Sequence, residues 1–299
     1  MSRAVEFGGE GSATPSVVDV DLAAPRPGEV RVTVRAAGIG GSGELYPAAF
    51  PTVGSDFAGV VTALGRGVAG LQVGDEVLGF SDTLAGQADA VVVPAGHVVR
   101  KPEGLSWEVA GSLCVAGAAA YACVHDVAVR DGDVVVVAGA CTDVGAFVVQ
   151  LARLCGARVI GVAAPEHHDW LLAHGVDAVD PAGGDGDPAE ELARRLAAAA
   201  PGGVHAFVDA RGADAGVAAA VATRLGVPPE RTVSTPVPAR GRVAGGGPVA
   251  PEVLSELAEL VGSGRLQVPI AGTYPLESVR AAYADVREHH PLGRVVLLP

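Results

Sequence analysis

Residues 133 to 162, DVVVVAGACTDVGAFVVQLARLCGARVIGV, constrain the fold more than any other part of the chain. The β-branched run at 134–137 predicts a parallel strand that is covered on both faces. Gly139 permits a sharp exit from that strand, and apolar residues then recur at helical spacing from Val144 onward. A second short strand follows at 158–162. Strand, glycine turn, helix and strand in this order predict the βαβ unit that cradles the pyrophosphate of a dinucleotide.

The turn of this unit carries Thr142 and Asp143 where such turns usually have small, uncharged residues. As an N-cap, Asp143 would satisfy free N–H groups of the helix. As a carboxylate at the pyrophosphate position, it would repel the ligand. Both can hold, because an N-cap carboxylate occupies the anion site itself. The helix dipole favours an anion at this position and desolvation disfavours it, and the two contributions to the binding free energy are similar in size. The sequence therefore does not decide whether Asp143 prevents dinucleotide binding.

Composition bounds the classes of function. The chain has 299 residues, of which 49% are hydrophobic, so one or two domains with sizeable cores are expected. A net charge of −13 argues against nucleic acid or an anionic membrane as a partner. The partner expected for this chain is a small-molecule substrate. The N-terminal MSRAVEFGG has no apolar leader region, so a cytoplasmic protein is expected. The cysteines form no CxxC pair, and buried free thiols are expected for all of them: Cys114, Cys123, Cys141 and Cys155.

Two patterns follow one another along the chain. Up to about residue 122, Gly and Pro punctuate short strand candidates, which suggests a barrel-like domain. These strands are expected at 17–20, 29–36, 59–64, 75–79 and 88–93. From about residue 123, strands and helices alternate. Further strands are expected at 178–179, 206–209 and 231–234, and helices at 166–174, 188–200, 214–225 and 251–263. After a helix at 277–288, a terminal strand at 294–298 could rejoin the first domain.

Several segments, in a fixed order, resemble the medium-chain dehydrogenase/reductase superfamily, specifically its zinc-independent quinone oxidoreductase branch. They are PRPGEVRVTVRAAGI at 25–39, PTVGSDFAGVV at 51–61, VGDEVLGF at 73–80, VAGAAAYACV at 115–124, the βαβ unit, and HPLGRVVL at 290–297. The resemblance implies an α/β fold with a GroES-like β-barrel domain at 1–122 and 265–299. It also implies a Rossmann domain with a doubly wound parallel sheet at 123–264, NADPH-dependent reduction of quinones or conjugated carbonyls, and a homodimer.

The chain departs from the family pattern at polar positions. Where zinc-dependent relatives have ligands, this chain has Gly40, Ser55 and about Val115, so no metal is expected. Ala119 stands in place of a family Thr, and Gln87 in place of a frequent active-site Tyr. Together with the ACTDVG turn, these changes remove groups that would hold a carboxamide or polarise a carbonyl.

The resemblance places five candidate catalytic residues near the cleft: Glu44, Tyr46, Asp56, Gln87 and Cys114. Glu44 and Tyr46 either contact the substrate or are simply solvated. Asp56 either accepts hydrogen bonds from loop N–H groups or is a buried acid suited to proton transfer. Cys114 either acts as a nucleophile or packs in the core, since no His adjacent in sequence would activate it.

Seven residues are expected to bind the cofactor, NADPH: Gly139, Cys141, Thr142, Asp143, Val144, His167 and Arg294. His167 either meets a 2′-phosphate, together with its neighbour His168, or lies in an exposed first helical turn. Arg294 either serves the phosphate or is a solvated C-terminal arginine.

Two functions follow. The first is a zinc-independent NAD(P)H oxidoreductase that passes a hydride to a quinone or enone. The second is a repurposed fold that has lost nicotinamide binding and catalyses a non-redox step, such as cyclisation, isomerisation or dehydration of an apolar natural-product intermediate.

Overall fold

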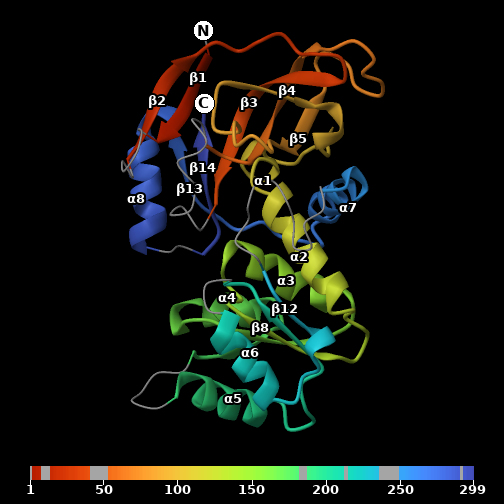
Figure 1. The fold of residues 1–299 in the computed structure, drawn as a ribbon, viewed down its shortest axis with the longest axis vertical. Helices are drawn as coiled ribbons and strands as arrows, with labels where there is room; N and C mark the ends of the chain where they lie inside the picture. Colours follow the sequence, from red (N-terminus) through yellow and green to blue (C-terminus); the bar gives the residue numbers. More distant parts are fainter. Residues whose placement is uncertain are drawn as a thin grey trace. The chain divides into compact units, whose positions relative to one another are not determined.

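The chain divides into two units, each with its own sheet and core. The computed structural model describes residues 2–7, 14–40, 53–181, 187–211, 215–235, 249–289 and 292–299. Unit 1 consists of Met1–Ala118 and Ala239–Pro299, and unit 2 of Ala119–Pro238. Both ends of the chain, coloured red and blue in Figure 1, therefore belong to unit 1. The expected boundaries, 122/123 and 264/265, differ from these.

Unit 2 contains a five-stranded sheet in which every pair of neighbours is parallel. The order is β10-β9-β8-β11-β12, so the chain runs outward from β8 to one edge and returns to fill the other side. This is the predicted doubly wound parallel sheet. Its strands are β8 (Val134–Ala138), β9 (Arg158–Val162), β10 (Asp177–Val179), β11 (Ala206–Asp209) and β12 (Thr232–Ser234).

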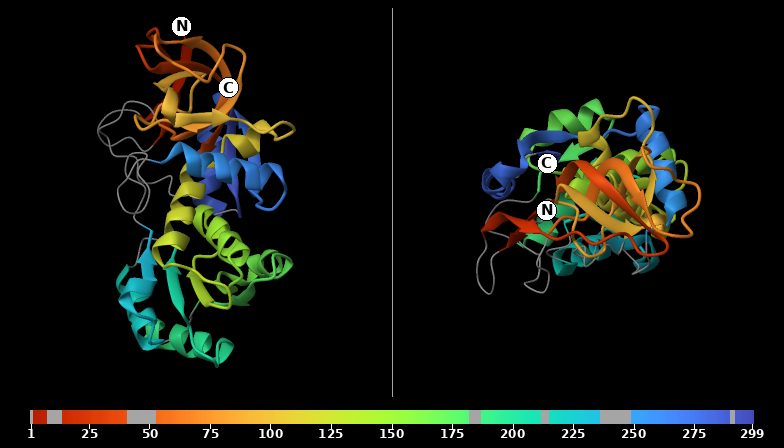
Figure 2. Two further views of the ribbon diagram at one scale, coloured as in Figure 1. Left: turned by 90° about the vertical axis from the view of Figure 1, so that its right-hand side faces the viewer. Right: turned by 90° about the horizontal axis from the view of Figure 1, so that it is seen from above.

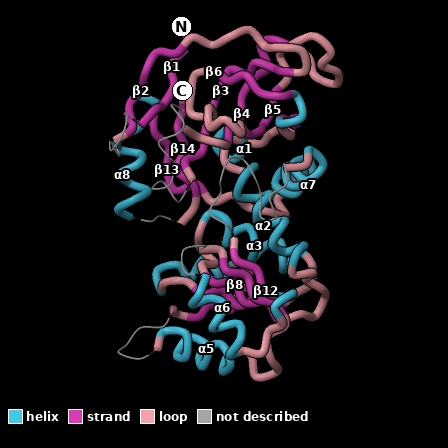
Figure 3. Tube along the Cα trace, viewed as in Figure 1, coloured by secondary structure: helices cyan, strands magenta, loops and turns pink. Residues whose placement is uncertain are grey.

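Helices cover both faces of this sheet (Figure 3). On one face, Leu192 and Leu196 of α5 and Val221 of α6 share a buried core with Val136 and Phe207 of the strands. On the other face, α3 packs on β8 and β9. The helices are α3 (Asp143–Leu154), α4 (His168–Ala173), α5 (Pro188–Ala199) and α6 (Ala215–Arg224), with 3-10 turns η2 (Pro165–His167) and η3 (Pro229–Arg231).

Unit 1 is built around the long strand β3 (Glu29–Ile39), which pairs antiparallel with three others, β4, β6 and β14. The terminal strand β14 thus rejoins the first domain, as the sequence predicted. A separate hairpin-like pair, β1 (Ser2–Phe7) and β2 (Pro15–Val20), is also antiparallel. The remaining strands are β4 (Asp56–Leu64), β5 (Glu76–Phe80), β6 (Ala90–Pro94), β7 (Val98–Arg100), β13 (Ile270–Pro275) and β14 (Arg294–Leu298).

The described helices and 3-10 turns of unit 1 are α1 (Trp107–Ala110), α7 (Pro251–Gly262), α8 (Val279–His289), η1 (Ala95–His97) and η4 (Leu276–Ser278). The residues of α2 (Cys114–Asp126) are divided between the two units, with the boundary after Ala118. Helix α8, in blue in Figure 2, packs on β2, β13 and β14. Its Tyr283 is among the largest fully buried side chains. Helix α7, expected in the Rossmann domain, belongs to unit 1 and packs on β7. None of the helices in the described ranges is long and apolar enough to cross a membrane.

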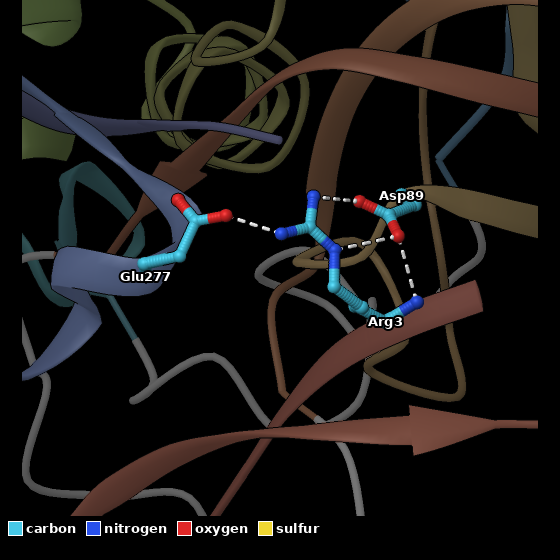
Figure 4. Close-up of polar contacts among 3 residues, drawn as sticks. All are labelled: Arg3, Asp89 and Glu277. Carbon is cyan, nitrogen blue, oxygen red and sulfur yellow. Dashed lines mark hydrogen bonds and ion pairs between the residues drawn. The ribbon is translucent and has the colours of Figure 1, made fainter.

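Polar contacts of Arg3 fasten β1 to the rest of unit 1 (Figure 4). Its guanidinium donates to both carboxylate oxygens of Asp89, at 3.0 and 2.8 Å, and its backbone N–H donates to the same carboxylate at 2.8 Å. A further ion pair joins Arg3 to Glu277 of η4. The bidentate pair with Arg3 lowers the pKa of Asp89 from its ordinary value.

Candidate functional site

In doubly wound sheets, ligands bind beyond the carboxyl ends of the strands, at the point where the strand order reverses. In unit 2 this switch point lies between β8 and β11, which are neighbours in the sheet but not in the chain. Gly139 leaves β8 there with a positive φ of 73°, a conformation that favours glycine. The hydroxyl of Thr142 lies 2.9 Å from the Gly139 carbonyl and 3.2 Å from the Ala210 carbonyl, so it ties the two loops together.

The N-terminus of α3 faces this turn, and its first donors are bonded within the loop. Thr142 is the N-cap, and its hydroxyl accepts from the N–H of Gly145 at 3.0 Å. Asp143 is the first helical residue, so its expected N-cap position is wrong by one. Its carboxylate still accepts from a free helix donor, the N–H of Val144, at 3.0 Å. The expected phosphate-binding donors therefore lie at the switch point, but they are already in use.

The two remaining unit 2 candidates are less well suited to bind an anion. Burial raises the pKa of the half-buried Cys141 thiol to about 12, so this side chain is neutral at physiological pH. His167 is half-buried at the end of η2 rather than in an exposed turn. The ring of the next residue, His168, makes a 2.9 Å hydrogen bond with the carbonyl of Ala163.

Two residues at the end of β11 were not predicted. The carboxylate of Asp209 is buried and accepts from the N–H of Arg211 at 3.1 Å and from the hydroxyl of Ser234 at 2.9 Å. The guanidinium Nε of Arg211 lies 3.8 Å from the same carboxylate. The rule that polar residues just beyond a parallel strand meet ligands could have found both, because the strand at 206–209 was predicted correctly.

In unit 1, Asp56 and Arg294 form a buried ion pair at 2.8 Å. The second carboxylate oxygen of Asp56 accepts from the N–H of Val115, in the first turn of α2, at 2.9 Å. A negative charge there also interacts favourably with the positive end of the helix. This donor lies in a helix and not in the neighbouring loop that the structural alternative named, and the proton-transfer role of Asp56 stays a prediction. The solvated alternative for Arg294 is wrong, because the residue is only 5% exposed.

Gln87 is fully buried, and both ends of its amide have partners in unit 1. Its carbonyl oxygen accepts from the hydroxyl of Tyr283 at 2.9 Å, and its NH2 group donates to the carbonyl of Gly38 at 3.4 Å. These contacts join α8 to β3. They give Gln87 a structural role, and its catalytic role stays a prediction without support from these contacts.

Cys114 is fully buried at the start of α2. Burial, together with the nearby negative charge of Asp56, raises the pKa of its thiol well above the ordinary value. A protonated buried thiol is a poor nucleophile, so the core-packing alternative is favoured. Cys123 is buried as expected, whereas Cys141 is only half-buried and Cys155 is exposed, so the expected burial of Cys155 is wrong. Glu44 and Tyr46 lie outside the described residues.

No side chain that commonly binds zinc stands at the positions that the resemblance compares with zinc ligands, which are Gly40, Ser55 and about Val115. Across the ranges given above, His, Cys, Asp and Glu side chains form no group of three or more that could hold a metal ion.

Two family models match the chain. Residues 26–126 match the alcohol dehydrogenase GroES-like domain, and residues 156–297 match the model described as zinc-binding dehydrogenase. The chain belongs to the medium-chain dehydrogenase/reductase superfamily. The resemblance first indicated by the sequence motifs is thereby confirmed, including the two-domain fold.

Solved structures of medium-chain dehydrogenases/reductases align along the entire chain. A mycobacterial quinone oxidoreductase is 26% identical, with a TM-score of 0.78, and the alignment covers 100% of both chains. The enoyl reductase CurK is 20% identical, with a TM-score of 0.80 and 99% of both chains covered. Because its identity is only 20%, the similarity to the enoyl reductase shows a shared fold and nothing more.

Curated relatives include large multidomain proteins. A mycocerosic acid synthase-like polyketide synthase of Mycobacterium tuberculosis is 35% identical over 169 residues, which are 53% of this chain and 8% of that protein. The chain thus matches only a small part of the relative's length. Together, the family models, the mycobacterial quinone oxidoreductase and the curated relatives support an enzyme of the medium-chain dehydrogenase/reductase kind.

Proposed function

We propose that the protein is a zinc-independent, NAD(P)H-dependent oxidoreductase that reduces a conjugated carbonyl. The observation that carries this proposal is the switch point of unit 2, where the Gly139 turn and the N-terminus of α3 lie at the carboxyl ends of β8 and β11. Quinone oxidoreductase and enoyl reductase neighbours support the same reaction class. The polyketide synthase match favours a conjugated ketone or thioester as the substrate class.

The residues at the switch point fit a dinucleotide, with one change from a glycine-rich turn. The backbone turn at Gly139 and the approach of α3 are those that a pyrophosphate requires. However, a pyrophosphate that uses the N–H of Val144 must displace the carboxylate of Asp143. One such hydrogen bond contributes about 0.5–1.5 kcal/mol net, so we expect Asp143 to weaken binding by about tenfold rather than to abolish it.

When bound, the nicotinamide would supply a hydride to the β-carbon of the conjugated carbonyl, while a proton is added at the α-carbon. The chain's own contribution is to bind and orient. The Gly139 turn and the first turn of α3 would hold the pyrophosphate end. Asp56, Gln87 and Cys114 are bonded or packed inside unit 1, which favours water or another side chain as the proton donor.

A titration of the purified protein with NADPH and NADH, followed by nicotinamide fluorescence and calorimetry, tests the proposal. Micromolar binding of either is expected, followed by oxidation of the bound nucleotide when a benzoquinone or a crotonyl thioester is added. Absence of binding at millimolar concentrations would overturn the oxidoreductase assignment.

One specific observation favours the second candidate, a non-redox enzyme on the same fold. The N–H groups of Val144 and Gly145 are satisfied within the loop, so the helix end does not need an anion. This candidate predicts no nicotinamide binding even after Asp143→Gly. The oxidoreductase predicts that the same variant binds NADPH more tightly.

A further inference from the structure

The side chain of Arg211 lies across the glycine turn of unit 2. A β-carbon at Gly139 would come within 2.4 Å of the Cγ of Arg211, so the missing side chain of Gly139 makes room for the arginine stem. The Arg211 side chain is 39% exposed. The stem is therefore fixed by packing, while the guanidinium can reach solvent.

This position is the switch point itself. Arg211 is the second residue beyond the carboxyl end of β11, and Gly139 is the first beyond the end of β8. The two strands are neighbours in the sheet. Thr142 also links their loops through its contact with the carbonyl of Ala210. A guanidinium placed here lies where doubly wound sheets bind their ligands.

Arg211 is not needed to satisfy its acidic neighbour. The carboxylate of Asp209 already accepts from a backbone N–H and from the hydroxyl of Ser234. The Nε of Arg211 lies 3.8 Å from that carboxylate, which is beyond hydrogen-bond distance. Within the described part of the chain, the guanidinium makes no hydrogen bond, so its donors remain available to a ligand.

The local chemistry favours an anion as this ligand. Asp143 and Thr142 use two helix donors that a phosphate would otherwise bind, and Asp143 adds a negative charge to the turn. The whole chain carries a net charge of −13, which opposes the approach of any anionic ligand. A guanidinium offers a fork of donors that matches the geometry of phosphate oxygens.

We propose that Arg211 is a binding residue whose guanidinium holds a phosphate group of the dinucleotide at the switch point of unit 2. It supplies the positive charge and the donors that the N-terminus of α3 provides in a glycine-rich turn. This inference rests on the proposed function for the identity of the ligand, and on the packing of Arg211 against Gly139 for its place.

The test compares Arg211→Gln, Arg211→Lys and a matched control, Arg130→Gln. Arg130 is exposed and lies shortly before the amino end of β8, whereas Arg211 follows the carboxyl end of β11. Binding of NADPH and of ADP, which lacks the nicotinamide, is measured by calorimetry at fixed salt concentration. We expect Arg211→Gln to weaken binding of both ligands by about tenfold or more, Arg211→Lys to weaken it less, and Arg130→Gln to leave it within about twofold.

The outcomes separate this inference from the proposed function. If the wild-type protein binds NADPH and Arg211→Gln binds it within about twofold of wild type, the inference is overturned while the oxidoreductase proposal stands. If the wild-type protein binds ADP through Arg211 but binds neither NADPH nor NADH, the inference holds and the oxidoreductase proposal fails. If none of these ligands binds, both fail. Thermal unfolding of each variant checks that it is folded. If Arg211→Gln does not fold, the affinity of Arg211→Lys, which keeps the charge but loses the forked donors, is compared with that of the wild type instead.

Discussion

The two candidate sites differ in how their charges are satisfied. In unit 1, Asp56 and Arg294 are buried and bonded to each other, and the remaining oxygen of Asp56 accepts from α2. In unit 2, the guanidinium of Arg211 is partly exposed and lies beyond hydrogen-bond distance of Asp209. A buried, paired charge contributes to the fold and is costly to unpair, whereas an exposed cation at the end of a parallel strand can meet a ligand.

This comparison teaches that a position in a family motif does not define the role of its side chain. Asp56 and Arg294 stand in matching segments, and Gln87 stands in place of a family Tyr, yet all three are held by contacts within unit 1. Arg211 stands in no segment that carried the resemblance, yet it lies at the ligand-binding edge of unit 2. If the comparison is right, substitutions in the first group change stability, and substitutions in the second change affinity.

The largest effect is expected from Asp56→Ala. This variant leaves the guanidinium of Arg294 buried without its carboxylate, which typically costs about 3–5 kcal/mol of unfolding free energy. The double variant Asp56→Ala/Arg294→Met removes both charges and should recover much of the loss. Urea denaturation measures both.

The control for this prediction is Asp21→Asn, which changes an exposed carboxylate in a loop of unit 1. We expect a change of less than about 0.5 kcal/mol there. A loss no larger than this in Asp56→Ala would show that the ion pair does not stabilise unit 1, and the contrast between the two sites would fail.

The second effect concerns the buried contact between α8 and Gln87. Tyr283→Phe removes the hydroxyl that donates to the Gln87 carbonyl and leaves a buried acceptor unsatisfied, at a cost of about 1–3 kcal/mol. Tyr274→Phe makes the same chemical change at a half-buried hydroxyl that donates to Asp285, and should cost less. Equal losses in the two variants would contradict the structural role given to Gln87.

The parts of the fold that the sequence could predict are those in which apolar residues form a continuous run or recur at a regular spacing. The strands at 134–138, 158–162 and 206–209 and the helices α5 and α7 end within about one residue of their expected bounds, because apolar runs and amphipathic stripes mark them. Helix α2 is apolar on most of its surface, with Ala, Val and Cys in succession, so no stripe predicted it. The strands β1, β7 and β13 were also missed, and β7, with three residues, is too short to show a period of two.

The contacts of the candidate sites could be predicted from the sequence only where the residues lie close together in the chain. The contacts of Thr142 and Asp143 with the N-terminus of α3 lie within three residues, so local rules for helix caps predict them almost fully. Asp56 and Arg294 are separated by 238 positions, and Gln87 and Tyr283 by 196. No local pattern shows such pairs, and only the tertiary structure reveals that these side chains are buried and paired.

A smaller effect, on affinity, is expected from the double variant Thr142→Gly/Asp143→Gly. It frees the N–H groups of Val144 and Gly145 for a phosphate, so we expect NADPH to bind about tenfold more tightly. The loss of the cap should lower stability by about 1 kcal/mol. Thr142→Ser, which keeps the capping hydroxyl, is the control. Unchanged affinity would show that Asp143 acts only on the helix and does not compete with the ligand.

The smallest effect is expected at the half-exposed contact of Asp89 with Arg3, which belongs to neither candidate site (Figure 4). Arg3 lowers the pKa of Asp89 in the folded state, so the carboxylate stabilises unit 1 above the ordinary pKa of about 3.9. This contribution decreases as the pH falls from about 5 through the lowered pKa. Solvent screening limits it, and Asp89→Asn should cost about 1 kcal/mol or less at pH 7.

The pH dependence distinguishes this carboxylate from an ordinary surface charge. Wild type and Asp89→Asn should differ in urea stability at pH 7 and converge at acidic pH, because protonation removes from the wild type the same charge that the substitution removes. Asp21→Asn should show no comparable convergence. A difference that persists unchanged at acidic pH would mean that Asp89 stabilises β1 through its neutral hydrogen bonds, such as that from the Arg3 backbone, rather than through its charge. In that case the contact of Asp89 with Arg3 would stabilise unit 1 through hydrogen bonding and not through charge. The guanidinium of Arg211, which we expect to act through its charge on a ligand, would then differ from it even more.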